Sequence, residues 1–214
     1  MSNILPNNET SLLVPGSVGQ IEVLTAPARG DPKQAMAIIC HPHPLFGGTM
    51  HNKVVTTLSR TFQNVGLDTV RFNFRGVGKS QGEYAAGEGE TEDLLSIVSW
   101  VKETNPNTSL WLAGFSFGAY IAARAATQIE LALLILVAPP VEHFPMAELP
   151  VFQAPCLVIK GDQDEVVPPQ AVYDWINNRQ PRPKLIRFPQ TTHFFHGHLT
   201  ELRKTLEEIF LSFP

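Results

Sequence analysis

The sequence has few cysteines and no long hydrophobic run, and each shortage excludes a class of protein. Only two cysteines occur in 214 residues, Cys40 and Cys156, each at one end of a predicted strand. We therefore expect two small buried side chains in a reducing compartment rather than a disulfide framework. The longest apolar run, 131–140, is about half the length that a membrane span requires.

Basic residues are also scarce. Lysine and arginine number 16 against 20 aspartate and glutamate residues, so the net charge is -4, which argues against nucleic acid as the main partner. The N-terminal residues lack the basic start and apolar core of a signal peptide, so we expect a cytoplasmic protein that is not secreted and does not act at a membrane. The length favours a single domain over 1–214, and we expect about the first ten residues to be disordered.

Apolar segments alternate with amphipathic ones along most of the chain. Two short N-terminal segments, 11–14 and 20–26, predict an antiparallel hairpin. Further strands are predicted at 35–40, 67–74, 111–115, 131–138, 156–160 and 184–188, and helices at 52–64, 90–104, 117–129, 168–178 and 199–213. This alternation predicts an α/β fold, with a mostly parallel twisted sheet of about eight strands and helices on both faces.

A Gly-x-Ser-x-Gly pentapeptide at 114–118 follows an apolar strand and leads into helix-forming residues. A serine at such a strand-to-helix turn projects from a strained backbone toward a neighbouring base. Gly114 and Gly118 would prevent a collision where the strand and the helix converge. The positive end of the helix would also face the charge that develops during acyl transfer. Ser116 is therefore the candidate nucleophile.

A serine nucleophile needs a base and an acid that orients the base. Asp164 follows one predicted strand after Ser116, and His193 follows the next. The order serine, acid, histidine is the one expected for this kind of elbow. The alternatives are Asp162 and Glu165 for the acid, and His196 and His198 for the base.

Two other chemistries fit the motifs less well. Histidines 41, 43, 193, 196 and 198 are predicted to reach one edge of the sheet, but no cysteine or carboxylate completes a familiar ligand spacing. We therefore expect neither a metal nor another cofactor. Residues 76–80 resemble a phosphate-binding loop, yet the position of its leading glycine is occupied by Asn73.

Four loop segments together resemble the α/β-hydrolases, and in particular a group of small bacterial serine hydrolases. These segments are 41–50, 71–80, 114–118 and 161–168. The resemblance covers the fold from the first strand to the last helix. It implies that the acid is Asp164, which lies three residues after the glycine that ends its strand and shortly before a Val-Pro pair, and that Arg75 ties loops together.

Backbone N–H groups are expected to stabilise the oxyanion. Phe117, the residue after the nucleophile, would supply one of them. In the loop after the first buried strand, prolines 42 and 44 have no N–H, so His43 or Leu45 must donate the other. Similarity to the corresponding loop of dienelactone-hydrolase-like enzymes favours Leu45, with His43 as the alternative.

The sequence therefore predicts a serine hydrolase that cleaves small or short-chain carboxylic esters or thioesters through an acyl-enzyme intermediate. The segment 139–154 is too short for a cap domain, so we expect an open site and a small-molecule substrate. Two alternative functions remain open. The first is a peptidase or acyltransferase with the same triad, and the second is a catalytically idle ligand-binding module.

Overall fold

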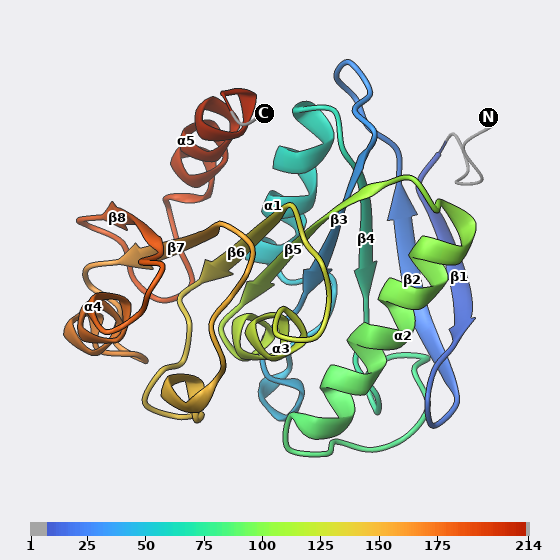
Figure 1. Cartoon of the computed structure of the whole chain (residues 1–214), viewed down its shortest axis with the longest axis horizontal. Helices are drawn as coiled ribbons and strands as arrows, with labels where there is room; N and C mark the ends of the chain where they lie inside the picture. Colours follow the sequence, from blue (N-terminus) through green and yellow to red (C-terminus); the bar gives the residue numbers. More distant parts are fainter. Residues whose placement is uncertain (1–7, 213–214) are drawn as a thin grey trace.

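The centre of the computed structural model, which describes residues 8–212, is an eight-stranded sheet (Figure 1). The strands lie in the order β1-β2-β4-β3-β5-β6-β7-β8. Their bounds are β1 Thr10–Pro15, β2 Gln20–Ala26, β3 Ala35–Cys40, β4 Asp68–Phe72, β5 Ser109–Phe115, β6 Leu133–Val137, β7 Cys156–Gly161 and β8 Lys184–Phe188. The pairs β1/β2 and β2/β4 are antiparallel and all others are parallel, which confirms the predicted α/β fold.

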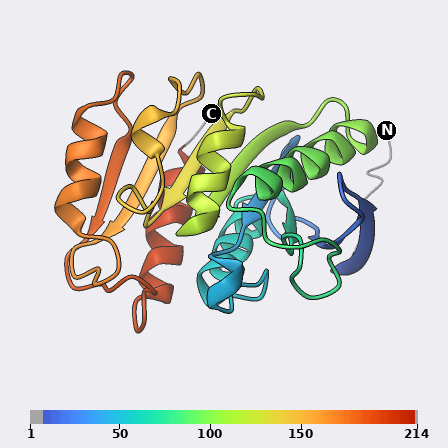
Figure 2. The same cartoon turned by 90° about the horizontal axis from the view of Figure 1, so that it is seen from below.

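Helices cover both faces of this sheet. Figure 2 shows α1 and α5 on one side and α2, α3 and α4 on the other. The helices are α1 Lys53–Asn64, α2 Glu88–Thr104, α3 Phe117–Ala125, α4 Pro169–Asn177 and α5 Leu199–Leu211. Two short 3-10 helices, η1 Pro44–Phe46 and η2 Met146–Glu148, lie in the connections after β3 and β6. No helix within residues 8–212 is long and apolar enough to cross a membrane.

Successive side chains of the central strands enter two separate hydrophobic cores. In β3, residues 36, 38 and 40 face the core under α2, α3 and α4, whereas residues 37 and 39 face the core under α1 and α5. Because side chains of a strand alternate between its two faces, a strand that is covered on both sides needs an apolar residue at every position. This requirement accounts for the continuous apolar runs in the sequence.

Several predicted element ends are wrong by a few residues. β4 ends at Phe72 rather than at 74, and β6 is shorter than the predicted 131–138. α3 ends at Ala125 rather than at 129, because the chain then tightens into a turn with bonds three residues apart. In that turn the N–H of Thr127 and its hydroxyl both donate to the carbonyl of Arg124, at 3.3 Å and 2.8 Å.

Residues 8–10 belong to the segment for which disorder was expected, and the structure describes them. Thr10 opens β1, and the carboxylate of Glu9 forms an ion pair with Arg71 at 2.9 Å. Residues 1–7 lie outside the described residues. Phe213, which the sequence places on the apolar face of the last helix, also lies outside them.

The segment between β6 and β7 packs against the body of the protein and forms no lid. The ring of Phe144 stacks on Tyr120 of α3 with 4.6 Å between centroids, and Met146 is buried. The indole N–H of Trp175 donates to the carbonyl of Met146 at 3.2 Å. These apolar residues therefore cover α3 and α4, which confirms that no cap domain is present here.

Candidate active site

Ser116 lies between the end of β5 and the start of α3, in a backbone conformation that L-residues rarely adopt. Its φ and ψ angles are 53° and -122°. The surrounding backbone holds this conformation, since the N–H of Ser116 donates to the carbonyl of Val137 at 2.9 Å and its carbonyl accepts from Ala119 at 2.8 Å. Strain that is kept by neighbouring hydrogen bonds is common at functional residues, because it presents a side chain in one fixed direction.

The two glycines of the pentapeptide allow backbone segments to touch. A Cβ at Gly114 would lie 2.0 Å from the carbonyl oxygen of Gly118, as expected where β5 and α3 converge. A Cβ at Gly118 would instead lie 2.4 Å from the carbonyl oxygen of Cys40. The collision at position 118 is therefore with the end of the neighbouring strand β3, and not with β5 as the sequence suggested.

The structure brings the three predicted triad residues into one hydrogen-bonded line. The hydroxyl of Ser116 lies 3.0 Å from Nε2 of His193, and Nδ1 of His193 lies 2.8 Å from Oδ2 of Asp164. The imidazole is only 2% exposed and lies beside the rings of Phe115 and Phe194, at centroid distances of 5.2 Å and 5.0 Å. With a proton on Nδ1 bound to the carboxylate, Nε2 is free to accept the serine proton.

The carboxylate of Asp164 is buried and fully hydrogen-bonded. Oδ1 accepts the backbone N–H groups of Val166 and Val167 at 2.9 Å and 2.8 Å, and Oδ2 contacts both His193 and the ammonium of Lys160. Burial by itself raises the pKa of Asp164, but the donors from His193, Lys160 and Val167 outweigh it and hold the pKa at about 2. Asp164 is therefore ionised at neutral pH.

The two alternative acids do not reach the imidazole. Asp162 pairs with the guanidinium of Arg187 at 2.7 Å and accepts the hydroxyl of Tyr173, and the hydrogen bonds from Arg187 lower the pKa of Asp162. Glu165 accepts the backbone N–H of His193 at 3.1 Å and does not bind the imidazole ring. Of the three candidates, only Asp164 is placed to orient the base.

A close approach of two loops makes this arrangement possible. A Cβ at Gly161, the last residue of β7, would lie 2.3 Å from the carbonyl oxygen of Thr191. The loop that carries Asp164 can therefore touch the loop that carries His193 only because position 161 has no side chain.

The remaining histidines of this edge make other contacts. His196 is exposed and stacks on Phe194, and Nδ1 of His198 pairs with Glu201 at 2.9 Å. His41 is completely buried: Nδ1 donates to the carbonyl of Pro42 and Nε2 accepts the N–H of Phe74 at 3.0 Å. Burial lowers the pKa of His41 to about 4.

This structural role of His41 was not recognised in the sequence, where a buried neutral histidine cannot be distinguished from a catalytic one. The histidine side chains at this edge of the sheet also do not gather around one point. Within residues 8–212, no group of three or more histidine, cysteine, aspartate or glutamate side chains is placed to hold a metal ion.

The backbone N–H groups of Phe117, His43 and Leu45 are the candidate oxyanion donors. Phe117 is the first residue of α3, and its N–H has no acceptor among the described residues. The N–H of Leu45 donates to Nδ1 of His43 at 3.2 Å, whereas the N–H of His43 has no acceptor within residues 8–212. The structure therefore favours His43 over Leu45, although Leu45 was preferred from the sequence.

Arg75 holds several loops together at the same end of the sheet. Its buried guanidinium pairs with Asp93 of α2 at 2.8 Å and donates to the hydroxyl of Ser17 at 2.8 Å. Protein acceptors therefore hold Nε and Nη2 of Arg75, in keeping with the expected role of this residue in tying loops together. The side chain of Lys79, four residues further along the same loop, is exposed.

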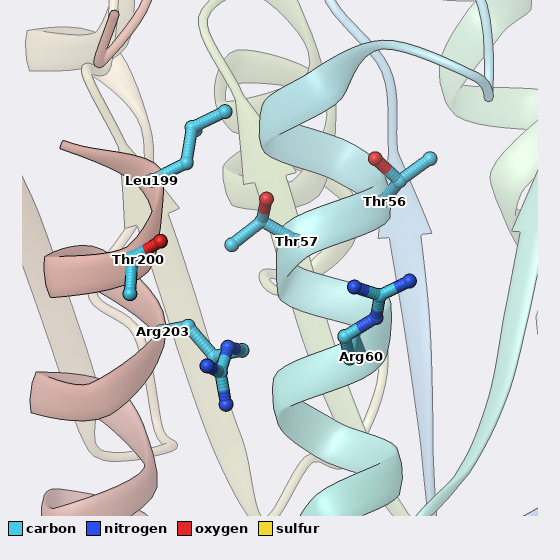
Figure 3. Close-up of a pocket in the computed structure, with 6 residues that line it drawn as sticks. All are labelled: Thr56, Thr57, Arg60, Leu199, Thr200 and Arg203. Carbon is cyan, nitrogen blue, oxygen red and sulfur yellow. The ribbon is translucent and has the colours of Figure 1, made fainter. Parts of the chain in front are cut away.

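A separate polar groove of about 210 Å³ lies between α1 and α5. Figure 3 shows Thr57 of α1 and Arg203 of α5 extending into the space between the two helices. The lining residues are Thr56, Thr57, Arg60, Leu199, Thr200 and Arg203. None of them belongs to the line formed by Ser116, His193 and Asp164 or donates to it, so the candidate active site lies elsewhere.

The chain is similar to known proteins over most of its length. Residues 31–151 match the family model described as serine aminopeptidase, S33. An uncharacterized protein of Rickettsia prowazekii is 33% identical over 208 residues, which cover 92% of this chain and 87% of that protein.

Two solved structures are similar in sequence as well as in fold. An α/β serine hydrolase homologue from Coxiella burnetii is 48% identical, with a TM-score of 0.93, over 97% of this chain and 99% of that chain. A protein from Xanthomonas campestris, described as an α/β serine hydrolase without lid, is 42% identical, with a TM-score of 0.91, over 97% of this chain and 95% of that chain.

Proposed function

This chain belongs to the α/β-hydrolase superfamily of serine hydrolases, and within it we propose an enzyme that cleaves small or short-chain carboxylic esters or thioesters. One observation carries the proposal. The hydroxyl of Ser116, the imidazole of His193 and the carboxylate of Asp164 form a continuous hydrogen-bonded line at the ends of β5, β7 and β8. Such a line is an arrangement that activates a serine for acyl transfer.

In the proposed reaction, Oγ of Ser116 attacks the carbonyl carbon while Nε2 of His193 takes the hydroxyl proton. The tetrahedral intermediate collapses when His193 returns this proton to the leaving alkoxide or thiolate, which leaves an acyl group on Ser116. Water then attacks the acyl group with the same proton transfers and releases the acid. Asp164 keeps Nδ1 of His193 protonated and stabilises the imidazolium, without itself taking up a proton.

The oxyanion of each tetrahedral intermediate needs donors that are already in place. In this proposal they are the N–H groups of Phe117 and His43, which have no acceptor among the described residues. The N-terminal end of α3 adds a partial positive charge next to Ser116. Donors that are fixed before the reaction cost no reorganisation, so they stabilise the transition state more than mobile water does.

The surroundings of Ser116 support a small and uncharged acyl group. The loops after β3, β7 and β8 expose four large apolar side chains near this end of the sheet, and we call them the apolar rim: Leu45, Phe46, Val166 and Phe194. The rim lies in the open, because no lid covers the site. It can contact a short acyl or alkyl group, but it does not enclose a long one.

A second candidate function is hydrolysis of a peptide from its N-terminal end. The name of the matching family model is one reason to consider it. A specific observation also supports it, since Glu165 places an exposed carboxylate next to His193, where it could meet an ammonium group. The apolar character of the rim argues for the ester instead.

A labelling experiment followed by matched substrates tests the proposal. We expect a fluorophosphonate probe to modify Ser116, as located by peptide mass spectrometry, and Ser116→Ala to remain unlabelled. We then expect hydrolysis of p-nitrophenyl acetate and acetyl thioesters, little hydrolysis of alanine p-nitroanilide, and no effect of exhaustive chelation. Labelling that persists in Ser116→Ala contradicts the triad, and a preference for the anilide supports the aminopeptidase.

A further inference from the structure

Lys160 is a completely buried lysine in direct contact with the candidate triad. It lies next to the end of β7, and its side chain has no exposed surface. Its ammonium forms an ion pair with Oδ2 of Asp164 and donates to the carbonyl of Val167 at 2.7 Å. Lysine is almost never fully buried unless it is paired, so this placement needs an explanation.

The ammonium completes the coordination of the carboxylate. Asp164 accepts four donors, two on each oxygen, which is about the number that an ionised carboxylate can accept. The two donors on Oδ1 come from the backbone of the same loop, whereas those on Oδ2 are the side chains of Lys160 and His193. Without Lys160, the imidazole of His193 is the only side chain within residues 8–212 that holds Oδ2 in place.

We propose, on the basis of the function proposed above, that Lys160 is a positioning residue of this site. It fixes Oδ2 of Asp164 in the direction that Nδ1 of His193 requires, and it offsets part of the negative charge that the imidazole experiences. Lys160 does not touch the substrate and acts only through Asp164.

Lys160 is the principal positively charged neighbour of the Asp164–His193 pair. From the loop after β7, Glu165 accepts the backbone N–H of His193, and Asp162 is occupied by Arg187 of β8. From β5 and the loop after β8, the rings of Phe115 and Phe194 contact the imidazole, and neither carries a charge. Removal of the ammonium therefore leaves the imidazole facing an uncompensated carboxylate.

Stability alone does not account for a buried Lys160–Asp164 ion pair at this position. Taking an ammonium and a carboxylate out of water is unfavourable, and their attraction only partly offsets this cost. Burial accordingly lowers the pKa of Lys160, while the hydrogen bond and the charge of Asp164 oppose this shift. Apolar residues in place of the whole pair would avoid this desolvation, but Asp164 has to stay ionised to orient His193, and Lys160 is the cation that keeps its buried carboxylate paired.

Two substitutions separate the charge of Lys160 from its hydrogen bond. Lys160→Met removes both, whereas Lys160→Gln removes the charge and keeps an N–H donor for Asp164. The exposed Lys79 offers the matched control Lys79→Met. For each variant we would measure the pH profile of kcat/KM with p-nitrophenyl acetate, the rate of fluorophosphonate labelling of Ser116 and the thermal midpoint of unfolding.

The two parts of the proposal predict two different effects. Loss of the charge leaves a stronger carboxylate field, which holds a proton on the imidazole more tightly. The acid limb of the profile should therefore move upward by about one pH unit in both Lys160 variants. Loss of the donor should lower the plateau of kcat/KM, by about tenfold or more in Lys160→Met and by less in Lys160→Gln. Lys79→Met should match the parent.

The outcomes distinguish this inference from the function on which it rests. If the parent protein is not labelled at Ser116, the proposed function itself fails. If the parent is labelled and both folded Lys160 variants keep its acid limb and plateau, Lys160 has no positioning role. A lower thermal midpoint with an unchanged profile, or loss of folding in both variants, shows a purely structural role and contradicts the proposal as well.

Discussion

The backbone N–H of Leu45 donates to Nδ1 of His43 at 3.2 Å, so the loop after β3 uses one of its own candidate oxyanion donors internally. This contact also orients the ring of His43, whose Nε2 lies 3.2 Å from the hydroxyl of Tyr84 and whose centroid lies 4.8 Å from that of Phe117. The N–H of His43 is left without an acceptor in the described part of the chain.

Replacement of Leu45 by proline tests this assignment, because proline removes the N–H. If His43 is the donor, kcat/KM of Leu45→Pro should fall by less than about tenfold, whereas loss of an oxyanion donor lowers kcat by about 10²–10³. The assay is ester hydrolysis, with circular dichroism to verify folding. A hundredfold loss in a folded Leu45→Pro protein would restore Leu45 as the donor.

Asp164 and Asp162 form a matched pair for mutation, two residues apart and both ion-paired. Asp164→Asn should lower kcat by about 10⁴, because an amide can favour the wrong tautomer of His193. Asp162→Asn should cost less than about tenfold, since Asp162 contacts Arg187 and Tyr173 at the surface rather than the imidazole. Steady-state kinetics of both variants decide the matter, and a reversed order would assign the acid to Asp162.

The buried His41 predicts a loss of stability in mild acid. Its pKa is about 4 in the folded protein and about 6.5 when unfolded, so the unfolded chain binds more protons between these two values. The contribution of His41 to the free energy of unfolding is therefore fully present above pH 6.5 and decreases as the pH falls toward 4. A difference of this size corresponds to about 3 kcal/mol.

Urea unfolding across pH 4 to 7 measures this effect. We expect His41→Gln to be less stable than the parent at pH 7 but to show a shallower decrease toward acid. His51, which is exposed, supplies the control, and His51→Gln should keep the slope of the parent. Equal slopes in His41→Gln and the parent would mean that other groups cause the acid sensitivity.

The open site predicts a preference for short acyl chains. Each buried methylene contributes about 0.8 kcal/mol, but only where an apolar wall removes it from water. The segment between β6 and β7 packs on α3 and α4 and adds no enclosing wall, so a substrate meets mainly the apolar rim. Among p-nitrophenyl esters, kcat/KM should be highest at about two to four acyl carbons. A steady increase to ten carbons, measured below micelle-forming concentrations, would require a long groove.

The sheet and its covering helices could be predicted because the pattern is regular. The apolar runs of the central strands and the amphipathic pattern of α1 and α5 each follow from one packing requirement, burial on two faces or on one. Since parallel strands direct their carboxyl ends to one edge, the chain order of Ser116, Asp164 and His193 was enough to bring them together. The resemblance to known hydrolases then chose Asp164 over Asp162.

The features that could not be predicted depend on single contacts between distant segments. A lysine near a strand end ordinarily reaches water, and only the fold of the loop after β7 shows that Lys160 is buried against Asp164. The choice between His43 and Leu45 depends on one hydrogen bond, from the N–H of Leu45 in η1 to the side chain of the preceding His43, which no periodicity encodes. The early end of α3 follows from the competing bonds that Thr127 makes.

The positive φ of Ser116 sets the reactivity of this residue against the stability of the fold. Alanine at this position removes the hydroxyl but keeps the unfavourable backbone, whereas glycine removes the hydroxyl and also adopts the conformation without steric cost. Ser116→Gly is therefore the inactive form best suited to capture an intact ester in a crystal. By the same reasoning, a screen that selects for thermal tolerance alone would tend to discard the nucleophile first.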